Sequence, residues 1–168
     1  VNNHNKPKAD SYSYYVFHAA RAEKMDARAA AFEVVQNSSK LQVVENYAKQ
    51  MAGFVFVQAA EANTKTFHKI SADKPCVVMI TQKYAVQQSS VADPTHKLTS
   101  IVISIQGNKK CKTTEAVYDK KKDKTFFTIQ LPQGADAGKT VKLLIEYIKN
   151  GSYELPFFCN NTLMMISV

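Results

Sequence analysis

Apolar and polar residues alternate at every second position through much of the C-terminal half of the chain. The clearest run spans residues 125–131 (Thr-Phe-Phe-Thr-Ile-Gln-Leu), and after a turn a second run spans residues 139–147. Such alternation places one set of side chains in a core and the other in solvent, as in an antiparallel sheet or sandwich. The pattern predicts strands at 66–70, 75–86, 98–106, 113–118, 125–131, 139–148, 153–159 and 162–168.

The same alternation predicts which side chains form the core. On the three sharpest strands, the apolar positions of one register are Ile101, Ile103, Ile105, Phe127, Ile129, Leu131, Val141, Leu143 and Ile145. We expect these residues to line one core. The segment 139–148 also fits a helical period, so strand and helix both stay open for it.

Residues 11–62 show a different pattern, typical of helices. Apolar and long side chains recur at three- and four-residue steps, first at Tyr14, Phe17, Arg21 and Met25, then at Leu41, Val44, Ala48, Met51 and Val55. Ser39 and Gln42 resemble a capping box at the start of the second segment. The pattern predicts helices at 12–36 and 39–61. Two alternatives stay open: a split of the first helix near Asp26, and a strand rather than a helix at 53–59.

Together the two halves predict an α+β fold. Residues 1–10 form a flexible tail, residues 11–62 a helical hairpin, and residues 66–168 an antiparallel β domain against which the hairpin packs. The apolar cluster 54–57 is interpreted as a core-facing helix end rather than a membrane-inserting one. No run reaches 18 apolar residues, so we expect no transmembrane segment.

The chain is basic, with a net charge of +8 and a pI of about 9.3. A basic balance favours anionic partners, although it also simply promotes solubility. Part of the charge is clustered, and the candidate residues for polyanion binding are Lys109, Lys110, Lys112, Lys120, Lys121, Lys122 and Lys124. Lysines at strand ends also guard sheet edges against pairing. Tyr118, Phe126 and Phe127 beside Lys124 are candidates for a single-strand nucleic-acid platform.

Cysteines and glycosylation sequons bear on the compartment. Cys76, Cys111 and Cys159 form no Cys-x-x-Cys pair and have no histidine at metal-ligand spacing, so we expect no metal site and no cofactor. One disulfide with a free thiol fits a secreted protein, and three thiols fit a cytosolic one, with the pairing left open. Sequons at Asn37, Asn150 and Asn160 are glycosylation candidates and favour the secretory route.

Motifs of catalysis are incomplete in this sequence. Residues 134–140 end in Gly-Lys-Thr like a phosphate-binding loop, but only three residues separate the two glycines where that loop has four. No nucleophile elbow and no His-Glu-x-x-His motif is present. We therefore expect a protein that is not an enzyme and has no catalytic residues.

One local stretch, about residues 124–148, resembles the luminal β-sandwich of ribophorin, a subunit of oligosaccharyltransferase. The likeness lies in the strand 126–131 ending in Leu131-Pro132, the turn residues Asp136 and Gly138, and the Val/Ile-rich strand 141–146 that ends in Glu146. The resemblance implies a non-catalytic, extracytoplasmic sandwich that supports a larger assembly.

The function expected from the sequence is a non-catalytic binding or structural β-sandwich module of a secreted or luminal protein. We expect a protein partner, with a homo-oligomer through residues 39–57 as a further option. The principal alternative is a basic nucleic-acid- or polyanion-binding protein, and a second alternative is a secreted toxin or inhibitor.

Overall fold

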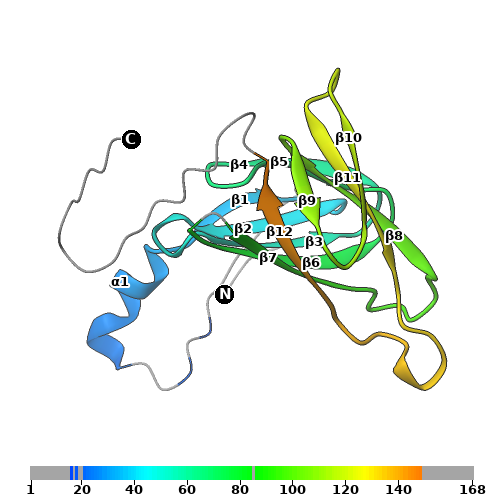
Figure 1. Ribbon diagram of the computed structural model, residues 1–168. Helices are drawn as coiled ribbons and strands as arrows, with labels where there is room; N and C mark the ends of the chain where they lie inside the picture. Colours follow the sequence, from blue (N-terminus) through cyan, green and yellow to red (C-terminus); the bar gives the residue numbers. More distant parts are fainter. Residues whose placement is uncertain (1–15, 17, 19–20, 85, 149–168) are drawn as a thin grey trace, which may run out of the picture.

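Two antiparallel sheets face each other across a shared core in the computed structural model of this chain (Figure 1). The structure describes residues 16, 18, 21–84 and 86–148. The expected strands 153–159 and 162–168, like the tail 1–10, lie outside the described residues. Among those that are described, no helix is long and apolar enough to cross a membrane.

The larger sheet has seven strands and the smaller sheet has five. In spatial order the larger sheet contains β1 (Glu33–Asn37), β2 (Leu41–Asn46), β3 (Met51–Phe56), β6 (Cys76–Lys83), β7 (Val86–Ala92), β12 (Val141–Tyr147) and β9 (Lys109–Cys111). The smaller sheet contains β10 (Glu115–Asp119), β11 (Lys124–Gln130), β8 (Ser100–Gln106), β5 (His68–Ala72) and β4 (Ala60–Thr64). The chain crosses between the sheets several times, so each sheet mixes early and late strands.

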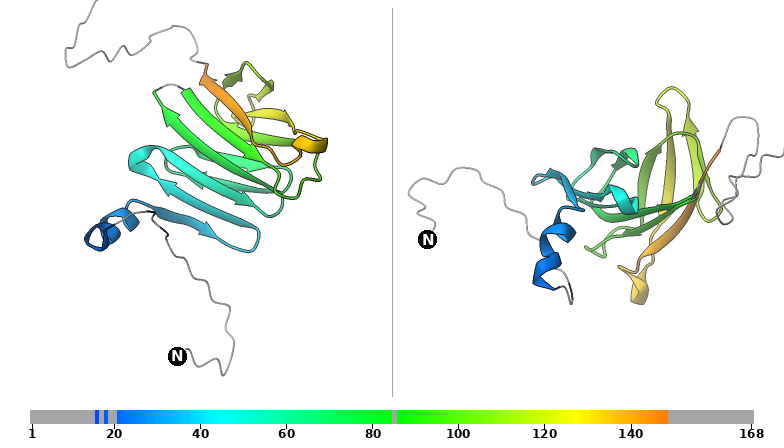
Figure 2. Two further views of the ribbon diagram at one scale, coloured as in Figure 1. Left: turned by 90° about the horizontal axis from the view of Figure 1, so that it is seen from below. Right: turned by 90° about the vertical axis from the view of Figure 1, so that its left-hand side faces the viewer.

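The predicted N-terminal helical hairpin is wrong, and the fold is therefore not α+β in the expected sense. Helical geometry in the described residues is limited to η1 (Ala22–Lys24), α1 (Met25–Ala29), η2 (Tyr47–Lys49) and η3 (Gly134–Asp136). The helix formed by η1 and α1 buries no residue and lies outside the two sheets (Figures 1 and 2). Its α-helical part, α1, begins at Met25, so Asp26 lies within the helix and does not cap it.

Burial explains why residues 33–64 form strands. In β2 the inward residues are Leu41, Val43 and Glu45, and in β3 every second residue from Ala52 to Phe56 is buried. Of the expected helical series, Val44 and Val55 lie on the outer face of the sheet, whereas Leu41 is buried. The expected capping box is a tight turn, in which the Ser38 hydroxyl accepts from the Leu41 amide at 3.2 Å. For the segment 53–59 the strand alternative is correct as far as Phe56, where β3 ends.

The predicted core is confirmed. Eight of the nine expected residues are at most 7% exposed, and Val141 packs partly buried against them. Phe127 is directly paired with Ile103, and Ile129 with Ile101, on neighbouring strands. Leu143 and Ile145 meet them from the opposite sheet, so the core lies between two sheets. The segment 141–147 is a strand, which settles the choice left open for it.

Two buried carboxylates hold the connections between strands. Asp93 is 2% exposed and accepts four hydrogen bonds, from the Thr95 hydroxyl and from the backbone N–H groups of Thr95, Lys97 and Leu98. Glu45 is 1% exposed and accepts from the amides of Lys65 and Thr66. Because burial of a charge is costly unless it is hydrogen-bonded, these contacts mark structural rather than catalytic carboxylates.

Candidate functional site

The seven candidate lysines fall on two structures that meet at one end of the sandwich. Lys109 and Lys110 are in β9, whereas Lys120–Lys122 form the tip of the β10–β11 hairpin, which extends beyond the sheets at the top of Figure 1. The Thr125 hydroxyl joins them, since it accepts from the Lys109 amide at 2.9 Å and donates to the Gly107 carbonyl at 2.7 Å.

Lys109 is an interior residue and not part of a basic surface. Its side chain is 3% exposed, and its Nζ lies 3.2 Å from the centroid of the Tyr147 ring. Burial lowers the pKa of Lys109 to about 7, with Asp123 acting weakly in the opposite direction. The residue is therefore wrongly placed among the polyanion-binding candidates as an exposed cation.

Three further candidates form ion pairs. Lys110 binds Glu146 at 3.1 Å, Lys122 binds Asp119 at 3.7 Å, and Lys124 binds Glu61. The remaining three, Lys112, Lys120 and Lys121, are exposed and take part in no ion pair among the described residues. An anion that approaches this end of the molecule thus meets uncompensated ammonium groups chiefly at the hairpin tip.

The hairpin tip is an ordered turn. The Asp119 carboxylate accepts from the amides of Lys121 and Lys122, at 2.9 and 3.2 Å, which presents the lysine side chains outward. Phe126 lies on the outer face with Lys122 Nζ 5.8 Å from its ring. Phe127 belongs to the core, and the Tyr118 hydroxyl donates to Asp123. Of the three aromatic candidates for the nucleic-acid platform, Phe127 is therefore buried, whereas Tyr118 and Phe126 are both half-buried.

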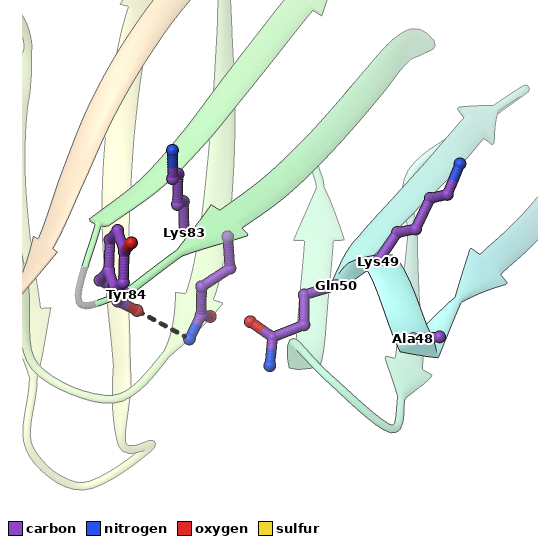
Figure 3. Close-up of a pocket in the computed structure, with 6 residues that line it drawn as sticks. Ala48, Lys49, Gln50, Lys83 and Tyr84 are labelled. Carbon is purple, nitrogen blue, oxygen red and sulfur yellow. Dashed lines mark hydrogen bonds between the residues drawn. The ribbon is translucent and has the colours of Figure 1, made fainter. Parts of the chain in front are cut away.

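A second basic feature was missed by the sequence analysis. We call it the turn basin, an open hollow of about 620 Å³ between the β2–β3 and β6–β7 turns (Figure 3). Its lining residues are Ala48, Lys49, Gln50, Gln82, Lys83 and Tyr84. Gln50 and Gln82 are 32 positions apart in sequence, and the two turns meet because β3 pairs with β6. No spacing rule within the sequence could have brought them together.

The remaining sequence-predicted groups do not assemble into a reactive centre. Cys76 is buried in β6, and burial raises the pKa of its thiol to about 12, which disfavours the thiolate needed for nucleophilic chemistry. Cys76 and Cys111 are both free thiols, while Cys159 lies outside the described residues. In the part of the chain that the structure describes, no cluster of three metal-ligating side chains occurs.

The glycosylation candidates are placed only in part. Asn37 is an exposed residue at the end of β1. Asn150 and Asn160 lie outside the described residues. Glycosylation stays a prediction for all three sites.

Comparison with known proteins identifies related sandwiches. Residues 33–102 match the model of the C-terminal β-sandwich domain of polysaccharide lyase family 8. The chain is 28% identical over 145 residues to chondroitinase-AC of Pedobacter heparinus, a match covering 85% of this chain and 19% of that protein. A solved chondroitinase AC lyase is also 28% identical, with a TM-score of 0.57 over 73% of this chain and 17% of the other.

A more distant structure shares the fold. Xanthan lyase of Paenibacillus is 17% identical and superposes with a TM-score of 0.61, covering 84% of this chain and 14% of the lyase. The chain thus spans less than one fifth of the length of the relatives it matches.

These matches overturn the resemblance to the ribophorin-type luminal domain. That likeness used a strand, a Leu-Pro end and a glycine turn, features that many sandwiches share. The match at 33–102 instead begins in the segment that was wrongly predicted to be helical. The chain is therefore a β-sandwich similar to the C-terminal domain of polysaccharide lyase family 8.

Proposed function

We propose that this chain is a non-catalytic β-sandwich module that binds anionic polysaccharide in an extracytoplasmic setting. The single observation that carries the proposal is the similarity of residues 33–102 to the C-terminal sandwich of polysaccharide lyase family 8. Its relatives include a chondroitinase, which makes a sulfated polysaccharide a fitting ligand class. The sequence pointed first to a binding or structural module with a protein partner. The proposal instead favours polyanion binding, which was the principal alternative from the sequence.

The charge distribution supports the same conclusion. The net charge of +8 attracts a polyanion over long range, and the hairpin tip offers ammonium groups that no described carboxylate neutralises except at Lys122. A flexible polyanion contacts several such groups at once and releases counterions on binding. The hairpin therefore serves as the first contact surface.

The test is the salt dependence of binding to fluorescently labelled chondroitin sulfate chains, followed by anisotropy. Wild type should bind saturably, and the triple variant Lys120→Gln/Lys121→Gln/Lys122→Gln should lower the salt slope by up to about three units, near one per contact. A control with equal charge loss replaces Lys40, Lys97 and Lys142, which are exposed elsewhere. Equal salt slopes for the two triple variants would reject the proposal. A single-stranded oligonucleotide that binds more tightly than chondroitin sulfate would also reject it.

A further inference from the structure

We infer that the turn basin is a second binding site, one that takes a single acidic sugar unit of the polysaccharide rather than the chain as a whole. The inference rests on the proposed function for its ligand class, but it concerns different residues from the hairpin. The volume of the turn basin, about 620 Å³, is within the range of small-ligand sites.

The charges of the basin call for an external anion. Lys49 and Lys83 are both exposed and come from the two different turns, and both side chains extend away from the Gln50 amide (Figure 3). Neither lysine forms an ion pair within the described residues. An acidic sugar held over the hollow is attracted by both ammonium groups through space, and an oxyanion that reaches either one gains a charge-assisted hydrogen bond.

The two glutamines supply hydrogen-bonding groups for sugar hydroxyls. Gln82 is held at the floor, because its Oε1 accepts from Gln87 Nε2 at 3.1 Å and its Nε2 donates to the Tyr84 carbonyl at 3.3 Å. The Gln50 amide points into the hollow (Figure 3) and makes no side-chain hydrogen bond to a described residue. One amide carries both donors and an acceptor, which suits a hydroxyl that both donates and accepts.

Tyr84 provides the apolar surface that sugars need. Its side chain is 69% exposed, so a ring face is available to the C–H groups of a pyranose. Lys83 Nζ lies 5.7 Å from the same ring, which places positive charge beside the stacking surface. Aromatic stacking next to a cation selects an acidic sugar over a neutral one.

The two turns that carry these groups share an unusual backbone conformation and are joined by a hydrogen bond. Gln50 and Tyr84 both have left-handed backbone angles, with φ of 48° and 57°. Such angles are costly for residues other than glycine and concentrate at functional sites. The Gln82 amide donates to the Gln50 carbonyl at 2.9 Å, which joins the two turns directly. The backbones of Gln50 and Gln82 are thus held side by side.

The experiment measures the affinity of a chondroitin sulfate tetrasaccharide by calorimetry, since this probe is too short to span the sandwich. Lys49→Gln/Lys83→Gln should weaken binding about tenfold, corresponding to loss of two charged contacts. Tyr84→Asn should weaken it similarly, because asparagine tolerates the left-handed backbone but lacks the ring. The control Lys97→Gln/Lys142→Gln removes the same charge at the opposite end of β7 and should change affinity less than about threefold.

The possible outcomes separate the two proposals. Unchanged melting temperature shows that the variants fold, and the lysine pair remains informative if Tyr84→Asn does not fold. If wild type binds and both basin variants bind equally well, the basin inference is wrong and the proposed function stands. If wild type binds neither the tetrasaccharide nor long chains, both are wrong. Tetrasaccharide binding lost only in the hairpin triple variant would also reject the basin.

Discussion

The Lys109 amino group lies 3.2 Å from the centroid of the Tyr147 ring, so that a buried lysine contacts a ring that is 39% exposed. The Tyr147 hydroxyl accepts a hydrogen bond from Gln87 at 3.0 Å, and Gln87 also donates to Gln82 on the floor of the turn basin. The Lys109 amino group, the Tyr147 ring and the two glutamine amides therefore form a continuous series of contacts. Lys109 thus has a different environment from the exposed lysines 120–122 at the hairpin tip.

The Lys109 side chain should give the fold an unusual pH dependence. Its pKa falls from an ordinary 10.5 to about 7 on folding, so between these values the unfolded chain binds the extra proton. Stability contributed at this site therefore rises as the pH rises from about 7 to about 10.5. Urea unfolding of wild type and Lys109→Met, measured from pH 7 to 10, should show the gap between them changing in this direction. Parallel curves would contradict the shifted pKa.

Asp93 should contribute stability that is lost in acid. Burial alone would raise its pKa, but hydrogen bonds from Thr95, Leu98 and Lys97 outweigh burial and lower the pKa to about 2. The contribution is complete above the ordinary value of 3.8 and disappears as the pH falls through about 2. Asp93→Asn should lower the free energy of unfolding by about 2–4 kcal/mol at pH 7. The NH2 group of asparagine is a donor, and it would face backbone N–H groups that are donors too.

The control for this carboxylate is Asp136→Asn, an exposed aspartate paired with Lys139. It should cost less than about 1 kcal/mol. Chemical denaturation at pH 7 and at pH 2 measures both variants. A small loss at Asp93 would show that its loop is held by other contacts.

Two adjacent phenylalanines should differ sharply in their contribution to stability. Phe127→Ala should cost about 3–5 kcal/mol, because the ring is fully buried between the sheets. Phe126→Ala, on the outer face of the same strand, is the matched control and should cost clearly less. Equal losses in urea unfolding would mean that the strand register is wrong.

Gly53 is a site where a larger residue should stabilise the fold. It lies within β3 on the outer face, and a Cβ added there would meet nothing within 4 Å. Glycine weakens a strand interior through its flexibility, and valine favours extended backbone. Gly53→Val should therefore raise stability by about 0.5–1 kcal/mol in thermal unfolding. A lowered melting temperature would contradict the open space that the structure shows beside Gly53 on the outer face.

The strands β8, β11 and β12 were predictable because their inward positions are almost all apolar. The strands β7 and β9 were not predicted, and Gln87, Ser89 and Lys109 occupy buried positions in them. The N-terminal strands were not predicted either, because Glu45 occupies an inward position of β2 and breaks the alternation. Once that register was missed, Leu41, Val44 and Val55 fitted a helical series by coincidence. Only burial reveals that Val44 and Val55 are on the outer face.

The candidate sites also could not be predicted fully from the sequence, for a different reason. Clusters of lysines are visible in a sequence, but burial of Lys109 and the carboxylate partners of Lys110 and Lys124 depend on which strands become neighbours. The turn basin has no sequence signature, because Gln50 and Gln82 meet only through the pairing of β3 with β6. Strand order is the information that local pattern lacks.

The measurement that tests the central claim most directly is an NMR titration of the ¹⁵N-labelled chain with a chondroitin sulfate tetrasaccharide. If this sandwich is an anionic-polysaccharide module, shifts should concentrate at the Lys120–Lys122 turn and at the backbone and side-chain amides of Gln50 and Gln82. They should diminish as salt is added, because the contacts are largely electrostatic. Saturating tetrasaccharide that leaves both regions unshifted at low salt would contradict the account.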